Sequence, residues 1–359
     1  MNIEHLELLT CPCCSGKLEI KKKFLSRNRK IVKTGILNCK NCKASFPIHN
    51  YIPRFLKDSN LEVISFGYQW NSFPLSQIDS KTNINESEIR LFSETSLTKE
   101  NIRNESIIEI GCGAGRFLNI IKKYTPALLV GVDASNAVDS LSNHLDLKDE
   151  NLLIIQADIF RLPFKKNYFG HVFSIGVIHH TPNPFLAFKK IALLIRKGGK
   201  ISISVYENSL AHRTSKNSIK LAFYDFLWAA NLLRCEIFRS IFSKLPSVVQ
   251  IAYCKLVIPI LHFINKIPLI RYFRYLLPST CYRNLPVSYS IVDTMDTYAT
   301  QIVHQYRAKT IYFWFVSIGL NPKLLLSRDG WVSVTSDLDK LSNKSMINSK
   351  LKALPKSRF

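Results

Sequence analysis

Short apolar runs separated by polar and glycine-containing segments dominate the middle of the chain. Five of them follow one another, over 107–110, 128–132, 152–155, 172–175 and 201–205. Each run has the length of a buried strand, and 117–123 between the first two has helical character. Near the C-terminus a helix is expected over 311–318, and two further runs, 323–326 and 331–335, predict a closing hairpin. Buried strands that alternate with helices are typical of a doubly wound, mostly parallel α/β sheet, here of seven strands.

A glycine-rich turn follows the first predicted strand. Residues 107–116 read IIEIGCGAGR, so Gly111, Gly113 and Gly115 lie between the strand and the helix. Glycines at this place let the backbone turn tightly and approach a ligand. Strand, glycine turn and helix together bind nucleotide-like cofactors outside the strand ends of such sheets. The dinucleotide fingerprint would need a glycine where this chain has Arg116, so a different cofactor is indicated.

The spacing E-x-G-x-G-x-G, which begins at Glu109, resembles motif I of the class I S-adenosylmethionine-dependent methyltransferases. The residues 176–181 resemble the "VLHHT" loop of a large branch of this family, and 193–199 resemble its "LKPGG" turn. The resemblance covers 105–206 and implies a Rossmann-like methyltransferase fold. One position departs from the family pattern, because Gly170 stands where an Asp is usual. We expect the cofactor site to survive this change, with reduced activity as the alternative.

The resemblance also implies which residues hold S-adenosylmethionine. Asp133, at the tip of the second strand, would accept both ribose hydroxyls, and Asp158 would lie near the adenine amino group. The candidate cofactor-binding residues are Glu109, Gly111, Gly113, Gly115, Asp133, Asp158, Ile159 and Gly176.

Three histidines are candidates for a general base. A hydroxyl acceptor is a poor nucleophile until its proton leaves, so a neutral imidazole would accelerate methyl transfer. His179 and His180 follow the fourth strand, and His304 could approach from a later segment. If the backbone of the pair is extended, only one of the two can face the site. We favour His180, beside the turn residues Thr181 and Pro182; the alternative is that one histidine packs and the other bonds to backbone.

Four cysteines form two C-x-x-C pairs at the start of the chain. Cys11 with Cys14, and Cys39 with Cys42, have the spacing of two zinc knuckles, and four thiolates close a tetrahedral structural site. Cys13 falls outside this spacing. A hairpin with its tip near 27–33 would bridge the long separation of the pairs. We therefore expect one structural Zn²⁺ ion and a reducing compartment.

The segment around these cysteines, 5–57, resembles the small zinc-ribbon family that activates tRNA and release-factor methyltransferases. In related bacterial chains such a ribbon is fused in front of a methyltransferase. The arrangement predicts a separable module, whose loss would leave cofactor binding mostly intact. The aromatic run 66–71 resembles the "FGYQW" lead-in of the fused family; it would either close over the ligands or pack on the core. The polar residues 76–85 are interpreted as a linker or loop.

The net charge of +23 is distributed unevenly. It amounts to +9 over residues 1–57, +1 over 58–205 and +6 over 206–300, and residues 340–359 carry six basic and no acidic side chains. The excess therefore lies outside the predicted catalytic core. Either an anionic partner, such as a phosphate polymer or membrane surface, or an ordinary solvated surface would account for it.

A long apolar and basic insertion follows the fifth strand. Residues 248–265 are almost uncharged, but Lys255, Gln250, His262 and two prolines argue against a membrane span. A buried helical cap and a cap lying on a membrane interface both fit this composition. The stretch from Asp293 to His304 resembles "DxxDWxSPxY…H" of the fused family; it would either line the acceptor pocket or cap the next helix.

Together these features predict a cytoplasmic S-adenosylmethionine-dependent methyltransferase, with peripheral membrane association possible. The expected acceptor is a small molecule or lipid-linked saccharide, and the expected reaction is O-methylation. The alternatives are an RNA methyltransferase that grips phosphates with its ribbon, and a non-catalytic partner protein with a decayed site. The predicted parts are a ribbon (1–57), an aromatic lead-in and linker (58–104), the cofactor-binding core (105–206), a helical cap (207–300), the closing helix and hairpin (301–339) and a basic, disordered tail (340–359).

Overall fold

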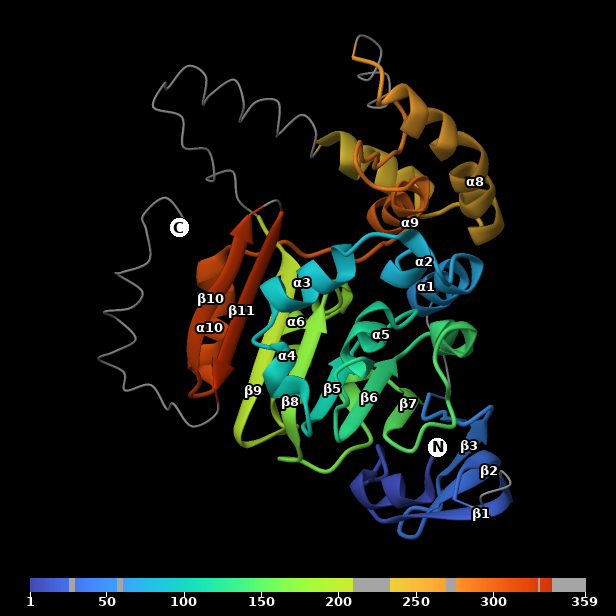
Figure 1. The fold of residues 1–359 in the computed structure, drawn as a ribbon, viewed down its shortest axis with the longest axis vertical. Coiled ribbons are helices and arrows are strands. Elements are labelled where there is room, and N and C mark those ends of the chain that lie inside the picture. The colour runs from blue at the N-terminus through green and yellow to red at the C-terminus, as the bar shows by residue number, and fades with distance from the viewer. Residues whose placement is uncertain (26–29, 57–60, 209–232, 269–275, 329, 338–359) are drawn as a thin grey trace.

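A computed structural model describes residues 1–25, 30–56, 61–208, 233–268, 276–328 and 330–337. Figure 1 shows a central sheet with helices on both faces, a small blue sheet beside one edge and a gold and orange helical cap beyond one end of the strands. The predicted tail (340–359) lies outside the described residues, as do residues 209–232 and 269–275 of the predicted cap.

The central sheet contains seven strands: β5 (Ser106–Ile110), β6 (Leu128–Asp133), β7 (Leu152–Gln156), β8 (Phe169–Ile175), β9 (Ile195–Tyr206), β10 (Asn321–Arg328) and β11 (Trp331–Asp337). Their order is β10-β11-β9-β8-β5-β6-β7. The strands β5 to β9 pair in parallel, whereas β11 is antiparallel to both of its neighbours. The chain order reverses between β5 and β8, where folds of this kind open a ligand site. The doubly wound, seven-stranded prediction is confirmed.

Helices cover both faces of this sheet because successive strand residues point in opposite directions. Ile107 packs with the face formed by α3 (Glu86–Glu94), α4 (Lys99–Ile102) and α5 (Arg116–Lys122). Ile108 packs with the face formed by α6 (Pro184–Ala192) and α10 (Ala308–Ser317). Short 3₁₀ turns follow three of the strands: η2 (Asn136–Asn143), η3 (Ile159–Arg161) and η4 (Ile178–His180).

The N-terminal part is a four-stranded antiparallel sheet. It comprises η1 (Ile3–Leu8), β1 (Leu18–Leu25), β2 (Val32–Cys39), β3 (Ser45–His49) and β4 (Ile52–Pro53). The strands β1 and β2 form the predicted hairpin, with its tip at 26–29 outside the described residues. We refer to residues 1–56 as the ribbon.

The ribbon is joined to the central domain by backbone hydrogen bonds and a shared core. Thr10 N donates to Pro163 O at 2.9 Å, and Lys165 N donates to Leu8 O at 2.9 Å. At the edge of the central sheet, Phe55 N donates to Gln156 O at 2.8 Å beside a parallel bridge between Arg54 and Gln156. Buried ribbon residues, including Phe46, belong to the same apolar cluster as the core of β8 and β9. The ribbon therefore extends the β7 edge and is not a separate body.

The cap consists of helical residues 233–242, α8 (Ser247–Ile264) and α9 (Val287–Tyr298). Two polar residues of α8 face inward: Gln250 donates to Phe242 O at 2.8 Å, and His262 Nδ1 lies 2.9 Å from the hydroxyl of Ser290. Among the described residues, α8 is the one helix that is long and apolar enough to cross a bilayer. In the molecule, 33% of this helix is buried. Gln250 and His262 thus pair inside the cap, whereas Lys255 is exposed.

The polar stretch 76–85 was interpreted as a linker or loop, and the structure corrects this for its first half. It follows α1 (Leu61–Ser72), contains α2 (Asp79–Thr82), and buries Gln77 and Asp79. The carboxylate of Asp79 accepts the backbone N–H groups of Ser87 and Glu88, both at 3.0 Å. These bonds satisfy the first turn of α3, so Asp79 is a structural partner of that helix, whereas Ser80, Lys81, Asn83 and Asn85 are exposed.

Candidate active site

A cavity of about 840 Å³ lies between the cap and the carboxyl ends of β5, β6, β8 and β9. Its wall combines the glycine turn, the loops after the parallel strands, the helices α1 and α9, and the start of β11. Ligand pockets generally measure about 300–1,000 Å³, so this cavity has room for a cofactor and a small acceptor together.

The glycine turn is held against β6. Gly111 N and Cys112 N both donate to Val132 O, at 2.7 and 3.0 Å. Gly111, Gly113 and Gly115 all have positive φ, a backbone conformation that side chains strain. A Cβ on Gly113 would lie 3.2 Å from the indole nitrogen of Trp70, so α1 already approaches the turn as closely as glycine permits. The aromatic lead-in therefore covers the loop and lines the cavity through Trp70 and Phe66.

Asp133 ends β6 and is fixed by three donors. Its Oδ2 accepts Gly113 N at 2.8 Å, and its Oδ1 accepts Ser135 N at 2.8 Å and the Ser135 hydroxyl at 2.6 Å. Burial raises the pKa of this carboxyl group above its usual range. Because each carboxylate oxygen can accept two bonds, Oδ1 is fully used and Oδ2 keeps room for one further donor from a ligand in the cavity.

Glu109 and Arg116 bring two incompletely satisfied groups to the cavity wall. Glu109 is 2% exposed, and its Oε2 has no partner among the described residues. Burial raises the pKa of Glu109 well above its ordinary value, while the nearby Arg116 opposes that shift. Arg116 donates to Ser87 Oγ at 3.1 Å and to Gln77 Oε1 at 2.6 Å, but Nη2 has no described partner. An ammonium and a carboxylate on one ligand would satisfy both residues.

The other predicted cofactor residues also reach the cavity. Asp158 and Ile159 line it, and Asp158 Oδ1 accepts Phe160 N at 2.9 Å, which orders the turn η3. Gly176, with φ of 78°, faces the ring of Trp331. The structure thus brings Glu109, Gly111, Gly113, Asp133, Asp158, Ile159 and Gly176 together around one cavity. Gly115 is not among the lining residues, and a Cβ there would meet Leu141 instead.

Of the three candidate histidines, His180 alone is among the lining residues. Its Nδ1 lies 2.9 Å from Ile302 O, so in the neutral ring Nδ1 carries the proton and Nε2 keeps a lone pair. Nε2 has no described partner, and burial lowers the pKa of His180. His179 instead packs 4.1 Å from Tyr206 between ring centroids, and the backbone N of His304 donates to His179 O. The segment forms the 3₁₀ turn η4, so the condition of an extended backbone is not met, although only His180 of the pair lines the cavity.

Two aspartates of α9 form the cap side of the cavity. Asp296 accepts the hydroxyl of Tyr206 at 3.0 Å, and Asp293 accepts the hydroxyl of Tyr282. Asp293 also accepts Gln77 Nε2 at 3.2 Å, and burial raises its pKa to about 6. The predicted alternative that this stretch caps the following helix is therefore wrong, because both residues lie inside α9 and line the cavity.

An aromatic and cationic wall closes the remaining side. The guanidinium of Arg90 lies 4.3 Å from the centroid of the Trp331 ring and pairs with Glu94 through two bonds of 2.6 and 3.2 Å. Tyr206 packs against the same ring at 4.8 Å between centroids. No sequence pattern identified Arg90, Glu94, Trp331, Tyr206 or Gln77 as site residues. Among the site residues that the structure adds, only Arg116 had a local signal, because it directly follows the glycine turn.

The two cysteine pairs meet in the ribbon. Sγ atoms of Cys11, Cys14, Cys39 and Cys42 all lie within 4.8 Å of one another, and Cys13 is not in the group. The contacts Cys11–Cys42 and Cys14–Cys39 measure 3.6 and 3.5 Å. Four thiolates at this separation fit a tetrahedral Zn²⁺ ion with no open position, which is a structural site.

Gly170, the departure from the family pattern, is explained by Glu105. A Cβ at Gly170 would collide with the carboxylate of Glu105, which lies over the start of β8. That carboxylate accepts Ser106 N at 2.8 Å and pairs with Arg196 at 2.6 Å. The space of the missing Asp side chain is thus filled by a carboxylate from the residue before β5.

Residues 108–203 match the family described as "Methyltransferase domain", and residues 2–50 match that described as "Trm112p-like protein". A fatty-acid O-methyltransferase of Mycolicibacterium smegmatis is 25% identical over 157 residues, 42% of this chain and 55% of the relative. A ubiquinone biosynthesis O-methyltransferase of Coxiella burnetii is 28% identical over 29% of this chain and 44% of its own length. A tRNA U34 carboxymethyltransferase of Nautilia profundicola is 23% identical over 32% and 40%.

The chain spans about half the length of the curated relatives that it matches. Among solved structures, the complex containing the Haloferax volcanii Trm112 methyltransferase activator superposes with a TM-score of 0.42 and 11% identity, over 76% of this chain and 98% of that one.

Proposed function

The chain carries a methyltransferase domain behind a Trm112-like zinc-ribbon domain, and we propose that it transfers the methyl group of S-adenosylmethionine to a hydroxyl oxygen of a small-molecule or lipid-linked saccharide. The observation that carries the proposal is the bond from Gly113 N to Asp133 at the switch point of the sheet. It joins the glycine turn to the carboxylate that would hold a ribose.

The cavity residues fit the cofactor at both of its ends. Asp133 would hold the ribose hydroxyls, and Asp158 with Ile159 would lie beside the adenine. At the other end, the unpartnered oxygen of Glu109 and nitrogen of Arg116 match the ammonium and carboxylate of an amino acid. When bound, S-adenosylmethionine supplies an electrophilic methyl group on a good leaving group. The chain's own task is then to position the acceptor and take up its proton.

His180 is the candidate for that proton. His180 is among the lining residues; its Nδ1 is committed to Ile302 O, which leaves the buried Nε2 lone pair without a partner among the described residues. Since burial lowers its pKa, His180 stays neutral at physiological pH and can accept a proton from a hydroxyl group. His179 and His304 remain weaker candidates, since neither is among the lining residues.

The cap side of the cavity supports a polyhydroxylated acceptor. Asp293 and Asp296 offer carboxylate oxygens, and the faces of Trp331 and Tyr206 offer flat apolar surface. Carboxylates that accept hydroxyl protons beside an aromatic ring suit a sugar, which has both polar edges and apolar faces. The names of the O-methyltransferase relatives agree with oxygen as the acceptor atom.

The first experiment is calorimetry of S-adenosylmethionine binding to the full chain. Micromolar binding that Asp133→Ala weakens, while an exposed control such as Lys17→Met does not, would support the proposal. Lack of binding would refute it and favour the non-catalytic reading. Methyl transfer is then followed with tritiated cofactor against saccharide-lipid extracts and against total RNA.

The base is tested with the acceptor that this screen identifies. His180→Ala is expected to lower kcat by about 10²- to 10⁴-fold at saturating cofactor. The matched controls are His179→Ala and His304→Ala. A kcat for His180→Ala within about threefold of the native value would contradict the assignment.

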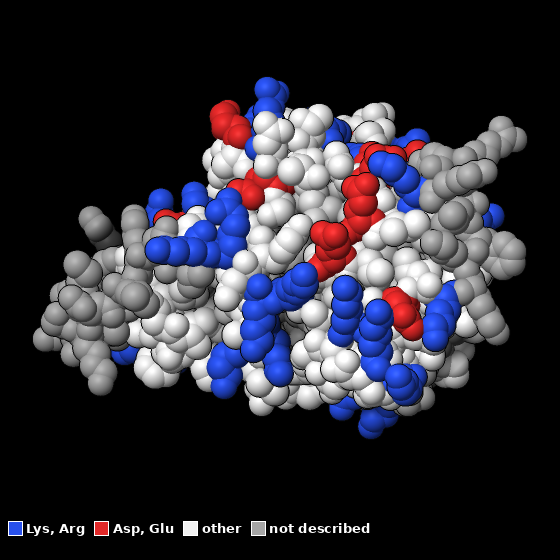
Figure 2. Space-filling view, turned by 90° about the horizontal axis from the view of Figure 1, so that it is seen from below, with Lys and Arg blue, Asp and Glu red and all other residues white. Residues whose placement is uncertain are grey.

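RNA is the competing acceptor. Exposed lysines of the ribbon, such as Lys17, Lys40 and Lys43, lie on a strongly basic module, and Figure 2 shows groups of blue side chains on the face opposite the cap, broken by a red band. The lining of the cavity, however, comes from the carboxyl ends of the parallel strands, the helices beside them and the cap, and contains none of these lysines. Labelling of RNA in the screen, with affinity falling steeply as salt rises, would favour the RNA reading.

We further propose that the protein is cytoplasmic and touches an anionic membrane through α8. Leu256, Ile260 and Phe263 are 70%, 60% and 65% exposed, and follow one stripe of the helix. Two exposed lysines lie nearby: Lys255 in α8, whose Nζ is 5.5 Å from the centroid of the Phe73 ring, and Lys266, two residues after the end of the helix. An apolar stripe with basic side chains nearby suits the interface of an anionic bilayer.

Flotation with anionic and neutral vesicles tests the membrane proposal. Binding should be stronger to anionic vesicles, by up to about 1 kcal/mol for each lysine near the surface, and should fall with salt. Leu256→Gln should reduce it, whereas Lys17→Met in the distant ribbon should not. Equal flotation with both kinds of vesicle would refute an interfacial role and leave the cap as a substrate-binding element.

A further inference from the structure

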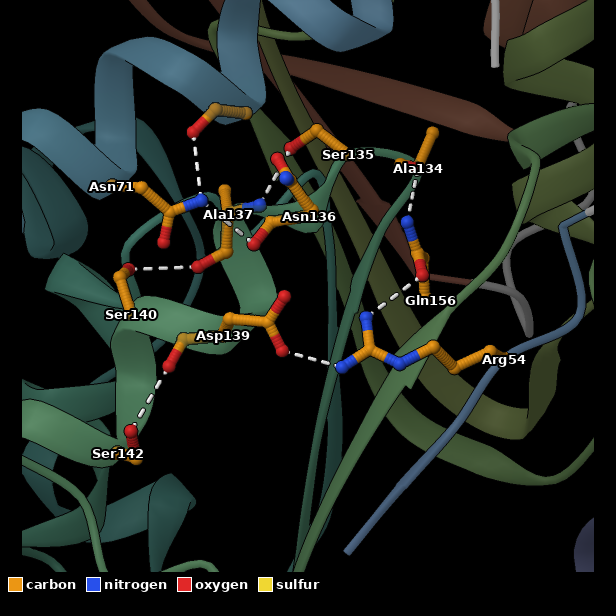
Figure 3. A network of polar contacts seen from close by, with 11 residues as sticks. Arg54, Asn71, Ala134, Ser135, Asn136, Ala137, Asp139, Ser140, Ser142 and Gln156 are labelled. Atoms are coloured by element: carbon orange, nitrogen blue, oxygen red, sulfur yellow. Dashed lines mark hydrogen bonds and ion pairs between the residues drawn. The ribbon is translucent and has the colours of Figure 1, made fainter. Parts of the chain in front are cut away.

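The residue that joins the ribbon to the loop at the end of β6 is Arg54. Figure 3 shows its guanidinium between Gln156 and Asp139. Nη1 donates to Gln156 Oε1 at 2.9 Å, and Nη2 pairs with the carboxylate of Asp139 in η2. The Arg54 side chain is 15% exposed and that of Asp139 is 42% exposed, so the Arg54 end of the pair is largely buried while the Asp139 carboxylate reaches solvent.

Gln156 connects Arg54 to the loop after β6. Its side-chain amide uses the oxygen to accept from Arg54 and the nitrogen to donate to Ala134 O at 3.1 Å. Ala134 is the residue directly after Asp133. The next residue, Ser135, donates to the carboxylate of Asp133 through both its N–H and its hydroxyl group. One amide thus connects a ribbon side chain to the backbone that orients the candidate ribose carboxylate.

A second contact holds the same segment from the opposite side. Asn71, at the end of α1, donates to Asn136 O at 3.0 Å and to Gly67 O at 2.9 Å (Figure 3). Residue Asn136 begins η2, the turn that also carries Asp139. The segment from Asp133 to Asp139 is therefore held between the ribbon and the lead-in helix, whose Trp70 covers the glycine turn.

We propose that Arg54 is a positioning residue, through which the ribbon orders the 133–139 segment for cofactor binding. The inference rests on the proposed function, since it names a further residue for the same cofactor site. The ribbon stays docked through backbone bonds, from Phe55 N to Gln156 O and from Thr10 N to Pro163 O, when the Arg54 side chain is removed. Its effect on the cofactor can for this reason be measured on a folded protein.

The test is a double-mutant cycle on the dissociation constant of S-adenosylmethionine. The proteins are the native chain, Arg54→Met, Gln156→Met and the double variant, measured by calorimetry with zinc content and melting temperature recorded for each. Lys17→Met removes the same charge from an exposed site of the ribbon and is the matched control.

We expect Arg54→Met to weaken binding about 5- to 30-fold, with native zinc content. Gln156→Met should have a similar effect, and the double variant should be no weaker than the worse single variant, because both changes break one path. Independent, multiplying effects, or unchanged affinity in Arg54→Met while the native chain binds, would overturn the inference. A native chain that fails to bind S-adenosylmethionine would instead refute the proposed function.

Discussion

Replacing Gly170 with alanine forces the carboxylate of Glu105 out of its place over β8. The new Cβ would occupy the space of the Glu105 carboxylate, and no other residue lies as close to that position. Gly170 does not have positive φ, so the strain comes from the collision and not from the backbone conformation. The stability of this variant therefore measures how strongly its contacts keep the Glu105 carboxylate in place.

The contacts of Glu105 set the size of the effect. Its Oε1 accepts Ser106 N at 2.8 Å, a bond to a charged group worth about 1.5–3 kcal/mol. The ion pair with Arg196 adds little, about 0–1 kcal/mol, because the Arg196 side chain is 44% exposed. Water replaces part of the lost bond, and alanine stabilises by about 0.4–1 kcal/mol through the unfolded chain. A net loss of about 1 kcal/mol remains for Gly170→Ala.

The assay is urea unfolding of four proteins: native, Gly170→Ala, Glu105→Ala and the double variant. With Glu105 truncated the collision disappears, so Gly170→Ala should become neutral or stabilising by up to about 1 kcal/mol. The change of sign between the two backgrounds is the expected result. An equal effect of Gly170→Ala in both backgrounds would show that Glu105 does not occupy the space of the missing Asp. Calorimetry should find cofactor binding unaffected by Glu105→Ala.

Three further predictions concern the metal, the cofactor and acid stability. The purified chain should contain one zinc ion, and Cys39→Ser should lose it and weaken cofactor binding at least as much as Arg54→Met; a zinc-free native protein under reducing conditions would contradict the site. Asp133→Ala should weaken S-adenosylmethionine by about 1–3 kcal/mol in calorimetry, and equal competition by NADH would be the contrary result. Burial lowers the pKa of His171 to about 4. Because folding favours the neutral form of His171, the free energy of unfolding has its full value above pH 6.5 and decreases as pH falls toward 4. The decrease should be about 2 kcal/mol between pH 7 and pH 5, and His171→Gln should reduce this pH dependence.

Features that depend on only a few consecutive residues could be predicted from the sequence. The cysteine pairs, the glycine turn and the acid at the end of β6 are each local, because chain spacing alone gives the metal geometry and the turn. The strands of the central sheet were likewise visible as apolar runs, since a parallel strand is buried on both faces.

The contacts that complete the site join distant parts of the chain, and no local pattern encodes them. Gln77 lies in a polar stretch that looks like a linker, yet it bonds Arg116 and Asp293, which are 39 and 216 residues away. The ribbon looked separable because its zinc site is self-contained. Its apolar residues are shared with the central core, so the structure predicts that its loss reaches the cofactor.

The position of β11 has a consequence for how the chain folds. This strand lies between β9 and β10, so Tyr206 must find Trp331 across the whole cap. Closing so large a loop costs entropy before any contact compensates for it, and contacts distant in sequence slow folding. During synthesis β9 leaves the ribosome with one edge unpaired. That edge stays unpaired until more than a hundred further residues, and then β11, have been made. A temporary partner for that edge, either the cap or a chaperone, is therefore needed until the last strand is made.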